Sequence, residues 1–386
     1  MKKLKITIAA LTALLAVTLS VGTAAAVTIP VDTTADTFKN DPTTCSLREA
    51  ISAANYDQPV DGCPSGTDGD VVSVPGGTYK IEIAGPDNLG VRGDFDVFWA
   101  DDLSIVPASA DAKVIIDANG VDRVFHQLAG AGKLVIRDMT IMNGNAFDSA
   151  GILLGESFEL SGLTITGNSA KIAGGIGVVN QGSTGTVVNS TISGNKAEID
   201  GGAIAVDDES SITVKNSTIT GNVADSDANG IGDGGGINAT AFDASVTLVN
   251  TINAGNSDLS PDPADQFSDC RTGPNFFPRY VVSTQAMGQA GCLVGFDPGT
   301  NKTVPDVKLS PLADNGGVTP THMPMAGSPV IDAGGSTAPD LCPEADQVGT
   351  VRAPGKCDIG AVEYVEPVIP EPEPDPQPLP GIKVPS

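Results

Sequence analysis

The sequence predicts an all-β fold, a parallel β-helix, from three observations. A short motif recurs five times between residues 134 and 257, its isoleucines stand 24, 27, 27 and 33 residues apart, and no copy has helical periodicity. The five copies are Met139-Thr-Ile-Met-Asn-Gly-Asn145, Leu163-Thr-Ile-Thr-Gly-Asn168, Ser190-Thr-Ile-Ser-Gly-Asn195, Ser217-Thr-Ile-Thr-Gly-Asn222 and Asn250-Thr-Ile-Asn-Ala-Gly-Asn256. A period of this length without helices indicates a solenoid built from strands.

Each repeat combines a β-branched run, the Thr-Ile pair, a Gly-Asn turn and usually a glycine pair before another apolar run. Ser211-Ile-Thr-Val-Lys215 and Gly235-Gly-Ile237 are examples. We expect three short strands per turn, joined by glycine and asparagine residues that accept positive φ. The longer fourth step places an insertion in a loop, which a solenoid tolerates.

The asparagine that ends each copy predicts an internal ladder. Adjacent turns lie about 4.8 Å apart, so equivalent asparagines can exchange amide hydrogen bonds. The predicted members are Asn145, Asn168, Asn195, Asn222 and Asn256. We interpret them as structural, because turn amides that face inward need partners. A row of ligand-binding amides is the alternative.

The N-terminus predicts export. Lys2, Lys3 and Lys5 precede an apolar stretch over residues 6–21, and Ala24-Ala-Ala26 offers a cleavage site, as in a secretory signal peptide over residues 1–26. The stretch is short for a membrane span and no second one follows. We expect a soluble mature chain without a membrane span. It is expected outside the cell or at the cell surface, including the outer membrane or cell envelope.

The charge balance disfavours two classes of partner. Without its first 26 residues the chain has 18 basic and 47 acidic residues, a formal charge of about −29. Such a surface repels nucleic acid and anionic lipid. It suits a protein that lives among divalent cations or salt, and solubility alone is the alternative explanation.

The cysteines predict three local disulfides outside the repeats. The expected pairs are Cys45 with Cys63, Cys270 with Cys292, and Cys342 with Cys357. Each closes a short loop and stabilises the fold by about 3 kcal/mol on the chain-entropy account. A metal site is disfavoured, because there is no C-x-x-C motif and both His126 and His322 are remote from these clusters in sequence.

An N-terminal helix is expected to cover one end of the solenoid. Ser46 and Glu49 form a capping box pattern at the start of the segment 45–55. One apolar stripe follows at helical spacing, made of Leu47, Ala50, Ile51 and Ala54. Such a cover protects the hydrogen-bonding edge of the first turn.

These patterns divide the chain into six segments. They are a signal peptide (1–26), an N-terminal cap with the first turns (27–112), the β-helix repeats (113–257), an acidic and aromatic insertion (258–300), a C-terminal region (301–365) and a Pro/Glu-rich tail (366–386). The tail reads as an extended linker.

Several of these segments carry motifs of a known family. Cys45-Ser-Leu-Arg-Glu-Ala50 resembles the motif of the secreted CSLREA-domain family, and Gly93-Asp-Phe-Asp-Val97 and Asp122-Arg-Val-Phe125 resemble segments that come after that motif in members of the family. The C-terminal region is similar to the associated choice-of-anchor domain of Q type, through Leu312-Ala-Asp-Asn-Gly-Gly317, Thr319-Pro-Thr-His322, Gly327-Ser-Pro-Val-Ile-Asp-Ala-Gly334 and Cys357-Asp-Ile-Gly-Ala-Val-Glu363.

The resemblance implies a right-handed parallel β-helix of the pectate-lyase type, with the disulfide-stapled C-terminal region as its second cap, on an exported and often surface-attached protein. It implies no established reaction. The repeats are also similar to those of polymorphic outer membrane proteins, which are associated with adhesion. Where the Q-type domain normally precedes an anchoring tail, this chain ends in an acidic, proline-rich run, which favours plain secretion.

Catalytic residues for a polysaccharide lyase or hydrolase are sparse. Asp207 and Asp208 are adjacent carboxylates within the repeats, but neighbours on a strand face opposite sides. The basic candidates are Lys171, Lys196 and Lys215, each also a plausible solvated lysine. Residues 113–257 hold no Trp or Tyr, and their four phenylalanines, Phe125, Phe147, Phe158 and Phe242, read as core or turn packing.

One segment predicts a calcium loop. Asp225, Asp227 and Asn229 occupy alternate positions before Gly230, as in the first half of a D-x-D-x-N-G loop, and Asp233 is a further oxygen ligand. Gly236 stands where such a loop places a bidentate Glu, so the site is incomplete. A solvated loop is the alternative.

The sequence as a whole favours a surface or secreted scaffold that binds a partner through its long lateral face. The expected partner is an extracellular polysaccharide or a cell-surface component. A polysaccharide lyase or glycoside hydrolase, and a passive coat or matrix protein, are the alternative functions.

Overall fold

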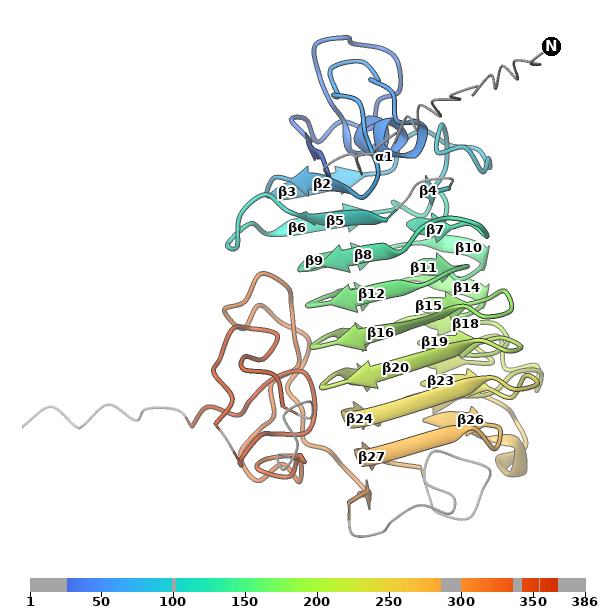
Figure 1. Cartoon of the computed structure of the whole chain (residues 1–386). Helices are drawn as coiled ribbons and strands as arrows, with labels where there is room; N and C mark the ends of the chain where they lie inside the picture. Colours follow the sequence, from blue (N-terminus) through green and yellow to red (C-terminus); the bar gives the residue numbers. More distant parts are fainter. Residues whose placement is uncertain (1–25, 99–101, 286–299, 336–341, 354, 367–386) are drawn as a thin grey trace, which may run out of the picture.

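The computed structural model describes residues 26–98, 102–285, 300–335, 342–353 and 355–366. The named strands form three sheets whose pairings are parallel and link each turn of the chain to the next (Figure 1). The predicted all-β solenoid is therefore confirmed. One α-helix, α1 (Leu47–Tyr56), and a 3-10 turn at Pro263–Asp265 complete the described secondary structure.

The largest sheet has 16 strands and supplies two faces of the solenoid. Its first face contains β1 (Thr28–Pro30), β2 (Asp70–Val74), β5 (Leu103–Pro107), β8 (Leu134–Arg137), β12 (Phe158–Ser161), β16 (Thr184–Val188) and β20 (Ser211–Lys215). Its second face contains β3 (Gly77–Lys80), β6 (Val114–Asp117), β9 (Met139–Met142), β13 (Thr164–Thr166), β17 (Thr191–Ser193) and β21 (Thr218–Thr220). The longer β24 (Ser245–Asn253) joins the two faces, and β27 (Phe276–Ser283) and β28 (Lys302–Thr303) extend them.

Two narrower sheets close each turn. The five-stranded sheet contains β10 (Asn145–Asp148), β14 (Ser169–Ile172), β18 (Lys196–Ala197), β22 (Val223–Ala224) and β25 (Ser257–Asp258). The seven-stranded sheet contains β4 (Phe95–Val97), β7 (Phe125–Gln127), β11 (Ile152–Leu154), β15 (Ile176–Val178), β19 (Ile204–Val206), β23 (Ile237–Ala239) and β26 (Cys270–Thr272).

The central turns therefore have four strands, where the sequence predicts three. The additional strand follows the turn asparagine and belongs to the five-stranded sheet. Its members hold only two to four residues. A run this short shows no periodicity, so sequence reasoning overlooks it.

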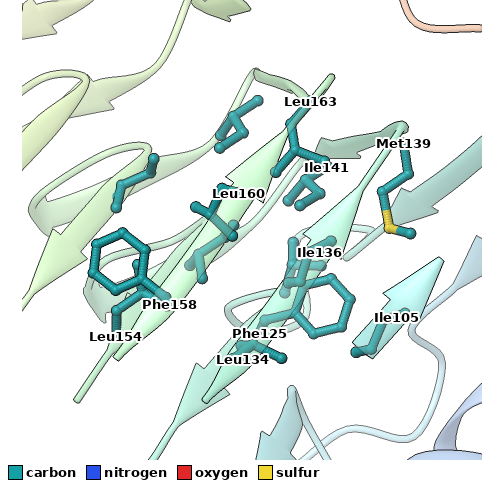
Figure 2. Packing of buried hydrophobic residues seen from close by; sticks show 14 of the residues in the cluster. Ile105, Phe125, Leu134, Ile136, Met139, Ile141, Leu154, Phe158, Leu160 and Leu163 are labelled. Carbon is teal, nitrogen blue, oxygen red and sulfur yellow. The ribbon is translucent and has the colours of Figure 1, made fainter. Parts of the chain in front are cut away.

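The core consists of aliphatic columns that run up the inside of the solenoid (Figure 2). Ile136 on β8 aligns with Ile105 of the preceding turn and with Leu160 of the following turn, and all three are fully buried. Phe158 is also buried, and a Cβ on Gly185 of the next turn would lie 2.5 Å from its ring. The glycine thus makes room for the larger side chain.

The last repeat slips by one residue. Ile252 aligns with Thr218, and Asn253 takes the place beside Ile219 that an isoleucine fills in the earlier turns. Because side chains alternate between the two faces of a strand, a one-residue slip exchanges inside for outside. Ile252 consequently packs in a second apolar cluster with Val282.

The asparagine ladder forms with four of its five predicted members. Asn168, Asn195, Asn222 and Asn256 are buried and linked by side-chain hydrogen bonds. Asn145 is exposed and lies outside the ladder, because its copy has one extra residue before the asparagine while Ile141 stays aligned with Ile165. Gly144 occupies the ladder position instead, and its N–H donates to Oδ1 of Asn168 at 2.8 Å.

Helix α1 covers the first turns, as predicted (Figure 1). Ser46 and Glu49 form both hydrogen bonds of the capping box, and the apolar stripe is buried. The pair Cys45–Cys63 is disulfide-bonded, which ties the start of the helix to the loop after it.

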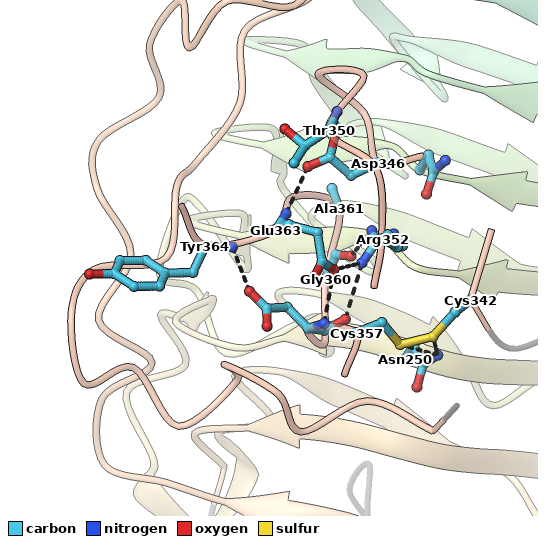
Figure 3. Close-up of polar contacts among 12 residues, drawn as sticks. Asn250, Cys342, Asp346, Thr350, Arg352, Cys357, Gly360, Ala361, Glu363 and Tyr364 are labelled. Carbon is cyan, nitrogen blue, oxygen red and sulfur yellow. Dashed lines mark hydrogen bonds and ion pairs between the residues drawn. A yellow bond between two sulfur atoms is a disulfide. The ribbon is translucent and has the colours of Figure 1, made fainter. Parts of the chain in front are cut away.

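The C-terminal region lies along the face of the solenoid that carries the Thr-Ile strands β9, β13, β17 and β21 (Figure 1). We call it the C-terminal strap; it comprises residues 304–335, 342–353 and 355–366. The side chain of Gln347 accepts from Thr191 and donates to Thr164, which belong to neighbouring turns. The strap is held internally by the disulfide Cys342–Cys357 and by a buried ion pair between Arg352 and Glu363 (Figure 3).

Some predicted features lie at or beyond the limits of the described chain. Residues 1–25, Cys292 and residues 367–386 are outside the described residues, so the signal peptide, the third disulfide and the tail stay predictions. The segment 258–300, expected as an insertion, supplies β26 and β27 as a further turn. No helix among the described residues is long and apolar enough to cross a membrane.

Candidate functional site

A groove of about 290 Å³ lies on the outside of the solenoid, over the seven-stranded sheet. Four consecutive turns supply its walls, from the end of β10 to the residues after β23. Its polar lining residues include Asp148, Asp200, Asp207, Asn238 and Thr240. Side chains far apart in the sequence therefore meet in one extended depression.

Small residues on the outward face of the sheet hollow out this groove. Leu153, Gly177, Ala205 and Asn238 align across four neighbouring strands. Gly177 and Ala205 stand in the middle of this row and have little or no side chain. The larger Leu153 and Asn238 border them, so the depression follows from one row of residue sizes.

Three carboxylates give the groove its negative character: Asp148 comes from one turn, and Asp200 and Asp207 both come from the turn two further along the chain. Asp200 is held by its own contacts, since its Oδ1 accepts from the Asp233 N–H at 2.9 Å and from Asn238 Nδ2 at 3.0 Å. Burial raises the pKa of Asp200 above its ordinary value of 3.8, partly offset by the charge of Arg271. No lysine or arginine is among the described residues that line the groove.

Two exposed phenylalanines stand next in sequence to residues that line the groove. Phe147 directly precedes Asp148 and is 64% exposed, and Phe242 directly follows the lining residue Ala241 and is 72% exposed. The Lys171 ammonium lies 5.1 Å from the centre of the Phe147 ring.

The sequence interpretation of these two rings as packing residues is wrong. Phe147 occupies an outward position on the narrow five-stranded sheet, and Phe242 lies in the turn before β24. The other two phenylalanines of the repeats, Phe125 and Phe158, are buried as expected.

The catalytic candidates from the sequence are not brought together. Asp207 lines the groove, whereas Asp208 accepts from the Phe242 N–H at 2.6 Å and holds the turn. Lys171 and Lys196 lie on the five-stranded sheet, and Lys215 lies on β20 of the 16-stranded sheet. Sequence reasoning missed Asp148, which the stacking of turns brings into the same groove as Asp207, and Asp200, which precedes Asp207 on the same turn.

The predicted calcium loop is held by its own hydrogen bonds. The buried Asp225 carboxylate accepts from the N–H groups of Asn229 and Gly230, both at 2.9 Å. Asn229 Nδ2 donates to Asp227 at 2.7 Å, and Asp233 forms an ion pair with Arg271. The loop therefore has a folded arrangement that needs no ion, and calcium binding by it stays a prediction.

Comparison with known proteins agrees with the observed architecture. Residues 115–252 match the family model described as a right-handed β-helix region. The solved structure of pectate lyase Pel9A superimposes with a TM-score of 0.45 at 13% sequence identity, covering 83% of this chain and 92% of that one. No curated protein matches the sequence. The strand pairings and the matched region together define a right-handed parallel β-helix protein.

Proposed function

We propose that this chain is an exported β-helix scaffold that binds a carbohydrate chain in the lateral groove without cleaving it. The observation that carries the proposal is the pair of exposed rings, Phe147 and Phe242, each next in sequence to a residue that lines a groove of carboxylate, amide and hydroxyl groups. Aromatic faces and polar hydrogen-bonding groups are the two features that hold a sugar. Large exposed apolar side chains that cluster at a groove usually serve binding.

The charge of the groove favours neutral or amino sugars. Asp148, Asp200 and Asp207 accept hydrogen bonds from sugar hydroxyls or ammonium groups, and they repel the carboxylates of a polyuronate. Export is supported by the N-terminal leader pattern and by the disulfides, which persist in oxidising compartments.

A glycoside hydrolase is the second candidate, and one observation favours it. Asp148 from one turn and Asp200 and Asp207 from the turn two further along line the same groove, and inverting and retaining hydrolases both use two carboxylates across the bond they cleave. The raised pKa of Asp200 is in the direction that a general acid requires. A lyase is less favoured, because the groove lacks a basic side chain among the residues that line it.

Affinity electrophoresis against neutral, amino-sugar and acidic polysaccharides tests the binding proposal. We expect retardation by a neutral or amino-sugar polymer, and about tenfold weaker binding by the double variant Phe147→Ala, Phe242→Ala, since one aromatic contact contributes about 0.5–1.5 kcal/mol. Phe277→Ala is the matched control, because Phe277 is 47% exposed but lies on β27, outside the groove. Equal binding by all three proteins would contradict the proposal.

A further inference from the structure

Three motif segments that are distant in sequence meet where the N-terminal cap joins the solenoid. Arg48 of α1 is buried and donates to the carbonyls of Gly90, Gly93 and Asp94 at 2.8–3.2 Å. Arg123, just before β7, forms an ion pair with Asp94 at 2.7 Å. The function proposed above uses none of these residues.

A compact group of possible ligands lies at this junction. Asp94 and Asp96 come from the segment of β4, and His126 lies on β7 in the next turn, where it aligns with Asp96. One ligand atom from each of the three side chains lies within 4.8 Å of the other two. Among the described residues this is the one such group of three or more His, Cys, Asp or Glu side chains.

Two buried atoms of the group lie against each other. Oδ1 of the fully buried Asp96 and Nδ1 of His126 are 3.2 Å apart, an ion pair when the imidazole is protonated, and neither atom has another hydrogen-bond partner in the described structure. A zinc ion bound to both atoms at about 2.0–2.2 Å would fit this separation and would take the place of the proton.

The surroundings hold the remaining carboxylate oxygens in place. Oδ2 of Asp96 accepts from the Gly90 N–H at 2.8 Å, and Oδ2 of Asp94 accepts from Arg123. Such outer contacts orient ligands and fix which oxygen remains for a metal. Asp94 is paired with the Arg123 guanidinium and Asp96 lies against His126, so both carboxylates already adjoin a group that favours their ionised form.

From this geometry we propose that Asp94, Asp96 and His126 bind a zinc ion. An imidazole nitrogen with two carboxylate oxygens is a donor set that zinc accepts, whereas calcium takes oxygen ligands alone. The His126 side chain is 18% exposed, so the group lies near the surface of the solenoid.

The ion has a structural role at this place. It links β4 to β7, which belong to neighbouring turns, beneath the cap helix. Asn55 of α1 donates to the Asp96 carbonyl at 2.8 Å and accepts from the Phe98 N–H at 2.9 Å, so the cap depends on the position of this strand. Zinc binding is therefore expected to stabilise the cap on the solenoid.

Zinc titration of the EDTA-treated full chain tests the proposal. Isothermal titration with ZnCl₂ alone should give one zinc per chain and a rise in Tm, and Co²⁺ should give the visible absorption of a protein-bound ion. His126→Gln should lower zinc affinity by about 100-fold or more, because it removes one of three ligands. His322→Gln is the matched control, since the chain has two histidines and His322 lies on the C-terminal strap.

Asp96→Asn should weaken zinc binding in the same way. If it fails to fold, His126→Gln still decides the question, because this side chain is partly exposed and glutamine is of similar size. Absence of stoichiometric zinc, or equal zinc affinity in His126→Gln and the wild type, would overturn the proposal. Protonation of His126, seen by NMR in a chain that takes up no zinc, would then explain the contact with Asp96.

Discussion

Asn195 donates its side-chain amide to Oδ1 of Asn222 at 3.0 Å, and Asn222 repeats the contact with Asn256 at 2.9 Å. The ladder ends on the buried carboxylate of Asp269, which accepts from the Asn256 side chain through Oδ1. Through Oδ2 the same carboxylate accepts from residues 283–285. One polar column thus runs beside the apolar core of the solenoid and is closed at its end by a fully partnered acid.

Removing one member of the ladder should destabilise the solenoid. Asn195→Ala leaves the backbone and side-chain amides of Asn168 without their acceptor, so we expect the free energy of unfolding to fall by about 2–3 kcal/mol. Urea denaturation measures this loss. Asn145→Ala is the matched control and should change stability by less than about 0.5 kcal/mol, because Asn145 is exposed. Equal effects of the two substitutions would contradict the ladder.

The sequence predicted the ladder where spacing alone decides it. Asn168, Asn195 and Asn222 each stand three residues after the repeated isoleucine, so stacking the isoleucines stacks the asparagines. Asn145 and Asn256 both stand four residues after their isoleucine. The prediction fails at Asn145, where Ile141 keeps its register with Ile165, and holds at Asn256, where the strand slips by one residue and restores the alignment.

The groove and the strap could not be predicted in the same way. The groove depends on Gly177 and Ala205 lying between larger neighbours on other turns, and no local pattern specifies that row. The position of the strap depends on contacts between residues about 156 positions apart, such as Thr191 with Gln347. Periodicity specifies the repeating unit, whereas irregular segments pack by shape and hydrogen bonding.

The strap should loosen when its central side chain is removed. Gln347 donates to Leu163, Thr164 and Thr319, so Gln347→Ala leaves several buried polar groups unpaired. We expect limited proteolysis within the strap to become at least about tenfold faster, while the solenoid strands stay protected. Val351→Ala is the control, because Val351 is 77% exposed. Unchanged proteolysis of the Gln347 variant would contradict the assigned contact.

His322 should make attachment of the strap sensitive to acid. Its ring lies between the Ser310 carbonyl at 2.7 Å and the Ser193 hydroxyl at 2.8 Å, and burial lowers its pKa below the ordinary value of 6.5. Below about pH 6.5 the unfolded chain therefore binds a proton that the folded chain does not. Stability contributed by neutral His322 is present above that pH and falls as the pH is lowered towards the folded pKa.

Thermal unfolding of the wild type and of His322→Gln between pH 5 and pH 8 measures this effect. We expect the wild type to lose more stability than the variant as the pH falls below 6.5, because glutamine does not titrate. Parallel curves for the two proteins would show that His322 does not contribute.

The loop predicted to bind calcium should depend on Asp225 for its folded arrangement. Asp225→Ala removes the acceptor of two backbone N–H groups from a buried position, and should lower stability by about 1–3 kcal/mol in EDTA. Asp227→Ala, at an exposed position, should have little effect in EDTA. Thermal unfolding of both variants in EDTA and in CaCl₂ measures this. Unchanged stability of Asp225→Ala in EDTA would contradict the structural role of this side chain. A rise in Tm that Ca²⁺ causes in the wild type and that both variants lose would establish calcium binding by the loop.

The central claim is that the groove binds a carbohydrate chain and does not cleave it. Release of new reducing ends, measured on the polysaccharides that the purified chain retains and with Ca²⁺ present, tests it most directly, because lyases and hydrolases both generate such ends. The account predicts retention without release. Release that Asp200→Asn abolishes would contradict it and identify the groove as the active site of a hydrolase.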